Sequence, residues 1–138
     1  MSLKKIHEEQ PKEFKFSPEN LLAAKNILEK YPKKNKKSAV MPLLYLAQKQ
    51  NKNWIPWAAI KYVAKYLAIP YIKVYELATF YSRYNLAPVG KYFIQVCTTS
   101  PCLLSGAEKL IKMCKENVSP KERELSKNRL CSWVEVEC

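Results

Sequence analysis

The last third of the chain contains two strand-like segments separated by a helix, and this order limits how it can fold. Residues 92–96 are aromatic and β-branched, which predicts a mostly buried strand. In residues 130–137 the side-chain types alternate along the chain, which predicts a second strand. Between them, a Ser-Pro pair at residues 100–101 begins a helix whose apolar stripe continues to Cys114. A polar linker, residues 117–128, follows. A crossover of this length joins parallel strands, so we expect a βαβ unit.

The preceding part of the chain has apolar residues at helical spacing instead. Helix-start signals predict short helices that begin at Ser17, near Ser38, near Trp54 and after Pro70. Short connections between them indicate that they pack against one another. We therefore expect their apolar stripes to form the core of a small helical domain.

These patterns divide the chain into parts. Residues 1–16 are polar and carry no period, which predicts a tail. Residues 17–86 form the helical bundle, and residues 87–138 form the α/β part. The predicted fold class is α+β.

Composition excludes several classes of function. The chain has 138 residues and two glycines, too few for the glycine-rich phosphate loops of nucleotide-binding proteins. No apolar run approaches the roughly 20 residues of a membrane span and the start lacks a secretory signal, so we expect a soluble intracellular protein without direct membrane insertion.

The net charge of +12 invites a nucleic-acid partner, but almost all basic residues are lysine, whereas nucleic-acid recognition favours arginine. We expect no nucleic-acid partner. The lysine-rich run 33–37 is interpreted as a solvated loop, with a contact patch for an acidic partner as the alternative.

The five cysteines should be reduced inside a cell, which makes them candidates for metal binding, chemistry or burial. Cys97 ends the first predicted strand, Cys102 lies in the first turn of the following helix, and Cys138 ends the second strand. Since parallel strands end at the same edge of a sheet, these three thiols should converge. Cys114 lies about 18 Å along the helix and Cys131 roughly 23 Å along the strand, so we expect both to be structural.

Three thiols at one edge leave several chemistries open. An iron–sulfur cluster takes thiolate ligands, and so does zinc, although structural zinc sites usually have tighter C-x2-C pairs than Cys97-x4-Cys102. Unliganded thiols, including a redox pair, are the third possibility. The single histidine, His7, lies in the predicted tail, which excludes paired Cys/His nucleophiles.

Short motifs in a fixed order resemble one family. They are Ala-Val-Met-Pro-Leu-Leu at 39–44, Val-Tyr-Glu-Leu-Ala-Thr-Phe-Tyr at 74–81, Pro-Val-Gly-Lys-Tyr at 88–92, Val-Cys-Thr-Thr-Ser-Pro-Cys at 96–102 and Val-Glu-Val-Glu-Cys at 134–138. From about Ser17 to its last residue, the chain resembles the thioredoxin-like 2Fe–2S ferredoxin subunit of respiratory complex I (NADH:quinone oxidoreductase), a family shared with some hydrogenases and formate dehydrogenases.

The resemblance implies a helical bundle followed by a thioredoxin-like domain that binds a 2Fe–2S cluster. By position, Cys97, Cys102 and Cys138 match three of the four cluster ligands of that family. The fourth ligand follows the third after three intervening residues, which is beyond residue 138. The resemblance therefore implies a C-terminally truncated, incomplete thioredoxin-like α/β domain, in which the cluster could be incomplete or absent.

The resemblance also implies a function and partners. The chain would be an electron-carrier subunit of an NADH dehydrogenase, an oxidoreductase subunit with no substrate site of its own, near the flavin of its partner. The implied partners are the flavin-binding NADH dehydrogenase subunit and other peripheral-arm subunits, on the cytoplasmic face of a bacterial inner membrane. The alternative is a cluster-free or zinc-bound structural subunit that docks on the flavoprotein.

Large aromatic residues give the helical part a candidate interface. They are more numerous than a small helical domain easily buries, so some should lie in contact with a partner. They are Trp54, Trp57, Tyr62, Tyr66, Tyr71 and Tyr75.

Overall fold

A computed structural model describes residues 4 and 6–138 of the chain. The described residues form two compact units, residues 4–87 and residues 88–138. The predicted boundary after residue 86 lies one residue before this division. Among the described residues, no helix is both long enough and apolar enough to span a bilayer.

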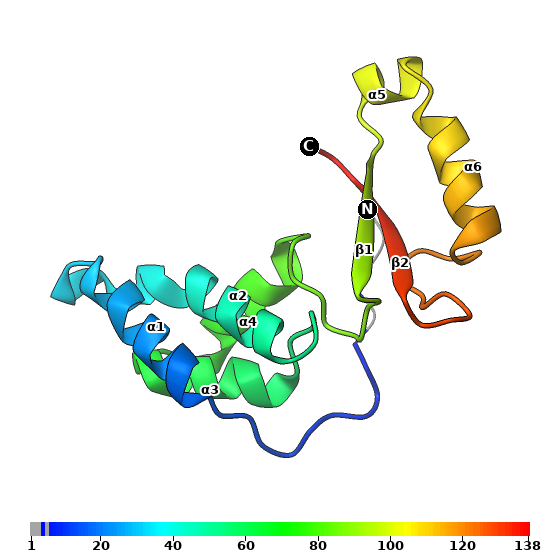
Figure 1. The fold of residues 1–138 in the computed structure, drawn as a ribbon. Coiled ribbons are helices and arrows are strands. Elements are labelled where there is room, and N and C mark those ends of the chain that lie inside the picture. Colours follow the sequence, from blue (N-terminus) through cyan, green and yellow to red (C-terminus); the bar gives the residue numbers. More distant parts are fainter. Residues whose placement is uncertain (1–3, 5) are drawn as a thin grey trace. The chain divides into compact units, whose positions relative to one another are not determined.

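The first unit is built from short helices, as predicted (Figure 1). The Ser17 hydroxyl accepts a hydrogen bond from the backbone N–H of Asn20 at 3.3 Å, which caps the first helix, and Pro70 directly precedes the last. The lysine-rich run, predicted as a loop, lies in a 3-10 helix with its lysines exposed. In chain order the elements are α1 (Pro18–Glu29), η1 (Lys33–Ala39), α2 (Val40–Gln50), α3 (Trp57–Leu67) and α4 (Tyr71–Phe80).

The core of this unit lies between α2, α3 and α4. Leu43 and Leu44 of α2, Ile60 and Val63 of α3, and Val74 of α4 have no exposed surface. Burial of side chains of this size contributes about 1.5–3 kcal/mol each relative to exposure. The apolar stripes therefore form a helix-packing core, as the sequence indicates.

The segment before α1 differs from the polar tail that the sequence suggests. Phe16 is 5% exposed and belongs to the core, and Phe14 packs against it. Both rings meet Tyr62 of α3 edge to face, with centroids 5.8 and 5.2 Å away for Phe14 and Phe16. These ring contacts help to hold the irregular segment against α3, and two phenylalanines leave no periodic signal in the sequence.

The second unit is a parallel strand–helix–strand arrangement (Figure 1). Its elements are β1 (Tyr92–Cys97), α5 (Ser100–Leu104), α6 (Ala107–Asn117) and β2 (Cys131–Val136). The register runs from Tyr92 opposite Cys131 to Cys97 opposite Val136. The predicted α+β fold class is confirmed.

Two details of this unit were predicted wrongly. The single helix expected after residue 100 is interrupted, because Gly106 adopts a φ of 101°, outside the helical region, and separates α5 from α6. The first strand, expected to be mostly buried, has one buried residue, Val96. Tyr92 and Ile94 are 57% and 38% exposed. They lie on the same face of β1 as Val96, but α6 packs at the level of Val96 and leaves the earlier residues in solvent.

The small core of the second unit centres on Trp133, which is fully buried. It packs with Val96 and Cys114, and its indole N–H donates to the backbone oxygen of Ser119 at 2.8 Å. This bond fixes the linker between α6 and β2. Gly90 lies against the start of β2, where its N–H donates to the buried Ser132 hydroxyl at 2.9 Å.

Candidate metal centre

The carboxyl ends of β1 and β2 bring two thiols into contact. Cys97 is the last residue of β1 and is opposite Val136, and Cys138 follows β2 by two residues. The sulfur atoms of Cys97 and Cys138 lie 3.1 Å apart. The parallel register therefore positions residues that are 41 apart in the sequence.

Cys102 completes the set of neighbouring thiols. It lies in the first turn of α5, which begins three residues after β1 ends. Its thiol is close enough to the Cys97 sulfur to contribute to the low pKa of Cys97. The structure thus brings together the three cysteines that the sequence predicts at this edge.

Hydrogen bonds stabilise the thiolate form of Cys97. The Thr99 hydroxyl, 3.2 Å from the Cys97 sulfur, and then the Thr99 backbone N–H make the largest contributions, followed by Cys138 and Cys102, and together they lower the pKa of Cys97 to about 6. The same contact raises the pKa of Cys138, whose hydrogen bond to Cys97 is the first cause. Near neutral pH, Cys97 is therefore a thiolate that accepts a hydrogen bond from the protonated Cys138.

The role of Thr99 did not emerge from the sequence. Its position two residues after Cys97, in the turn between β1 and α5, was the available signal. A hydroxyl so placed can bond back to the preceding side chain only if the turn closes in the right direction. That closure depends on where α5 begins, which is a matter of tertiary structure.

The two remaining cysteines lie elsewhere. Cys114 of α6 is 9% exposed, packs with Val96 and Trp133, and has a pKa raised by burial. Cys131 opens β2, opposite Tyr92, at the other end of the strand from Cys138. Both therefore lie away from the converging thiols.

The thiol set has the donor chemistry of an iron–sulfur site. Within residues 4 and 6–138, no group of three or more His, Cys, Asp or Glu side chains is arranged to hold a single metal ion. A 2Fe–2S cluster, however, distributes its protein ligands over two irons, so they need not surround one point. Three neighbouring thiols, one of them ionised near neutral pH, fit such a cluster as three of its ligands.

Replacing Thr99 by valine should raise the pKa of Cys97, because it removes the hydroxyl that contributes most to the low value. Alkylation of Cys97 in the metal-free protein, followed by peptide mass spectrometry against pH, measures this. In the parent chain the alkylation rate should rise through a midpoint near pH 6. In Thr99→Val the midpoint should move to higher pH, so that alkylation at neutral pH slows.

The matched control for that experiment is Thr98→Val, the same substitution one residue earlier. Its backbone N–H bonds to the oxygen of Val136 and is retained in the variant. An equal shift of the midpoint in both variants would contradict a specific effect of the Thr99 hydroxyl.

Comparison with known proteins places this site in a family context. The family model for the thioredoxin-like [2Fe-2S] ferredoxin matches residues 24–138. An NADH-quinone oxidoreductase subunit from Rickettsia bellii is 50% identical over 125 residues, which cover 91% of this chain and 75% of that protein. The corresponding subunit from Rickettsia typhi is 49% identical over 125 residues, covering 91% of this chain and 74% of the relative. An NADH-quinone oxidoreductase subunit from Rhizobium meliloti is 45% identical over 141 aligned positions, covering 100% of this chain and 51% of the relative. The parallel βαβ unit, its converging thiols and these similarities agree, and the chain belongs to the thioredoxin-like [2Fe-2S] ferredoxin family.

Proposed function

We propose that this chain is the electron-carrier subunit of an NADH–quinone oxidoreductase and that Cys97, Cys102 and Cys138 hold its 2Fe–2S cluster. The family and the names of the relatives confirm the predicted function and cofactor. The ligand assignment is carried by one observation, the 3.1 Å contact between the Cys97 and Cys138 sulfurs at one edge of the sheet, where Cys102 also lies near enough to influence the pKa of Cys97.

The cluster, when bound, supplies one-electron redox chemistry. Cys97 would serve as a ligand in its thiolate form, which its hydrogen bonds already favour. Cys138, whose pKa is raised by its hydrogen bond to Cys97, would have to lose its proton to serve as a thiolate ligand. The Thr99 hydroxyl lies within reach of the Cys97 sulfur, and hydrogen bonds to ligand sulfurs are one means by which a protein tunes a reduction potential.

Anaerobic incubation of the chain with iron and sulfide tests the proposed cofactor. The expected result is the visible absorption of a 2Fe–2S centre, together with a paramagnetic resonance signal after one-electron reduction. Acid-labile sulfide should accompany the iron. Iron or zinc that binds without labile sulfide would contradict the 2Fe–2S proposal and favour a structural metal.

We further propose that the partner is a flavin-binding subunit, within a complex on the cytoplasmic face of a bacterial inner membrane. An aromatic cluster, defined here as Trp57, Tyr71 and Tyr75, supports a docking surface on the helical unit. Tyr71 and Tyr75 stack with ring centroids 5.8 Å apart, and Trp57 meets Tyr75 edge to face at 6.2 Å. Trp57 is 37% exposed.

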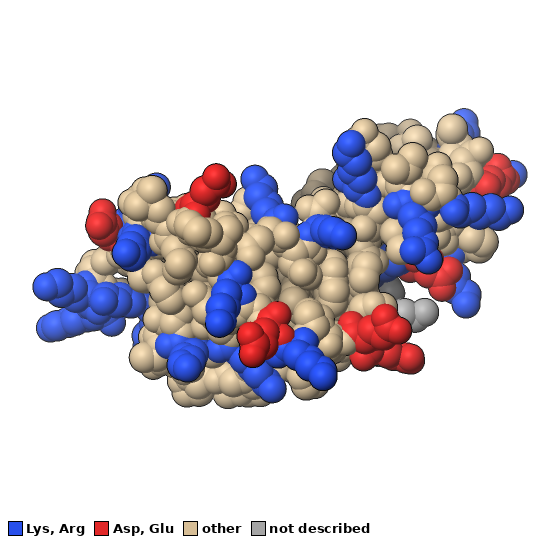
Figure 2. Space-filling model, turned by 60° about the horizontal axis from the view of Figure 1, so that its bottom comes forward, with Lys and Arg blue, Asp and Glu red and all other residues tan. Residues whose placement is uncertain are grey.

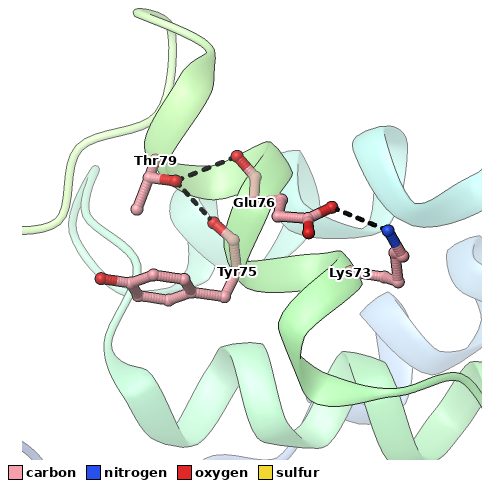
Figure 3. Close-up of polar contacts among 4 residues, drawn as sticks. All are labelled: Lys73, Tyr75, Glu76 and Thr79. Carbon is pink, nitrogen blue, oxygen red and sulfur yellow. Dashed lines mark hydrogen bonds and ion pairs between the residues drawn. The ribbon is translucent and has the colours of Figure 1, made fainter.

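The charged side chains of α4 lie on a different side of the helix from the Tyr75 ring (Figure 3). The Tyr75 ring points away from the ion pair of Lys73 and Glu76, whose charged atoms lie 3.2 Å apart (Figure 3). The Thr79 hydroxyl donates within the helix, to the backbone oxygens of Tyr75 and Glu76. Trp57 is the exposed ring of the cluster, and Tyr71 and Tyr75 are half-buried. Tryptophan and tyrosine are enriched at protein interfaces.

Replacing Trp57 by alanine in the full chain should weaken binding to the flavin-binding subunit on the order of tenfold, since truncated aromatic residues dominate interface energetics. Titration calorimetry with the purified partner measures the change, and circular dichroism checks the fold. Leu22→Ala on α1, which removes a side chain with 62% exposure, is the control and should leave the affinity unchanged. Equal losses in both variants would argue against the aromatic cluster as the docking surface.

A further inference from the structure

The helical unit contains a lysine-lined hollow between the segment before α1 and the outer side of α3. Its volume is about 260 Å³. Lys12 and Lys15 line it from the segment, and Lys61 and Lys65 line it from α3. Phe14 and Tyr62, which touch edge to face, provide its apolar lining. We define these residues as the lysine hollow.

The hollow concentrates positive charge that the chain does not neutralise. Its lining includes four lysines and one acidic residue, Glu13, which gives a net charge of +3. Within the part of the chain that the structure describes, none of these lysines makes an ion pair. Lys61 and Lys65 are four residues apart on α3, a spacing at which like charges destabilise a helix. Figure 2 shows that basic side chains also outnumber acidic ones over the face that it draws.

The fold holds this arrangement in place despite the repulsion. The Gln10 side-chain oxygen accepts from the backbone N–H of Trp57 at 2.9 Å, at the start of α3. The Lys15 backbone oxygen accepts from the Gln50 side chain at 2.7 Å, and Phe16 is buried beside Tyr62. The segment is thus fixed on both sides of Lys12. A rigid cluster of like charges lowers the cost of ordering the site when an anion binds.

We propose that the lysine hollow binds a carboxylate-rich segment of a partner protein. Lysine is a compact, strongly hydrated charge that suits separate carboxylates, whereas phosphate recognition favours the planar fork of arginine, which the lining lacks. The volume is below the range of about 300–1,000 Å³ that is typical of small-molecule sites, so individual side chains fit it better than a cofactor does. The rings of Phe14 and Tyr62 are half-buried rather than projecting, which disfavours insertion into a lipid surface.

This inference does not rest on the proposed electron-transfer function, since the hollow lies wholly within residues 4–87. Its test uses the full chain and a fluorescent peptide of alternating glutamate and serine. The double variant Lys61→Glu/Lys65→Glu should bind the peptide at low salt with an affinity lower by on the order of tenfold or more, because attraction becomes repulsion at two positions. The matched control is Lys34→Glu/Lys37→Glu, which makes the same change in charge on exposed lysines of η1. The control should lose less than about threefold.

Carbodiimide coupling of the same peptide to the unmodified chain locates the contact without a variant. Amide links should concentrate on Lys12, Lys15, Lys61 and Lys65. Links concentrated on residues 33–37, or equal loss of affinity in the two double variants, would overturn the proposal in favour of attraction by net charge alone.

The same variants are then tested with phosphatidylglycerol vesicles and with single-stranded DNA. If Lys61→Glu/Lys65→Glu weakens either of these more than it weakens the peptide, the hollow serves phosphates and the proposal is wrong. The neutral pair Lys61→Gln/Lys65→Gln, expected to lie between the parent and the reversed variant, keeps the test decisive if charge reversal disturbs α3.

Discussion

Replacing Cys97 or Cys102 with serine should reduce the iron that the chain retains after anaerobic reconstitution to background. Each substitution removes a thiolate from the edge where β1 and β2 end, and a serine hydroxyl remains protonated at neutral pH and is a poor ligand for iron. Cys97 should be the more sensitive position, because its sulfur contacts that of Cys138 and its thiolate is favoured by hydrogen bonds. Iron and labile sulfide per chain, with visible circular dichroism, measure the loss. Cys138→Ser should also reduce the iron and labile sulfide that the chain retains.

The matched controls are the two cysteines outside the site. Cys131→Ala should retain the cluster, and Cys114→Ala should retain it at a small cost in stability, because its thiol packs beside Trp133. Retention of iron and sulfide by the double Cys97→Ser/Cys102→Ser variant would refute the ligand assignment. Loss of the cluster in Cys131→Ala would show that the other end of β2 participates.

Gly90→Ala should unfold the second unit. A Cβ atom at residue 90 would lie 2.6 Å from the backbone carbon of Cys131 and 2.6 Å from the backbone oxygen of Leu130. Neither contact can be relieved by a side-chain rotation, so the chain must move away from β2 and lose the Gly90–Ser132 hydrogen bond. We expect a cost of about 3–4 kcal/mol or more, a large fraction of the stability of a small unit.

The readout for Gly90→Ala is the indole signal of Trp133 in a proton–nitrogen spectrum, since this N–H reports the bond to Ser119 in the second unit. The signal should lose its native position, while the indole signals of Trp54 and Trp57 in the first unit persist. Gly106→Ala is the comparison variant, because its cost should come from backbone strain and not from a steric clash. Nothing lies within 4 Å of its added Cβ, but its φ of 101° is strained for alanine, so a smaller cost of about 1–2 kcal/mol is expected. A larger loss in Gly106→Ala than in Gly90→Ala would contradict the steric argument.

Local sequence signals predicted most of the helices correctly. The Ser-Pro pair at residues 17–18 and the proline at residue 70 precede helices that begin within one residue of the expected position. Caps and prolines act through their nearest neighbours in the chain, and their effect therefore survives in any compact fold. The interruption at Gly106 was missed, because a lone glycine inside an apolar stripe is compatible with a continuous helix.

The convergence of three cysteines was also predictable, for a topological reason. A helical crossover makes the two strands parallel, and parallel strands place their carboxyl ends at one edge. This topology places Cys97 and Cys138 at the same edge of the sheet. The same rule placed Cys131 at the opposite end of β2.

Other features depend on contacts between distant residues. The exposure of Ile94, the hydrogen bond from Thr99 to Cys97, and the presence of Lys12 and Lys65 in the lining of one hollow each require knowing where a helix or segment packs. Residues 12–16 have no period and few apolar side chains, so their docking on α3 depends on Phe14 and Phe16 meeting Tyr62.

The sequence by itself therefore determined the α+β class, the parallel pairing and the edge at which the thiols meet, because caps, periodicity and crossover length act locally or through topology. Only the tertiary structure decided the protonation of the thiols, the burial of each face of β1 and the existence of the lysine hollow. These properties depend on distances of a few ångströms between residues that are far apart in the chain, and hydrogen bonds, desolvation and charge repulsion all vary steeply over such distances.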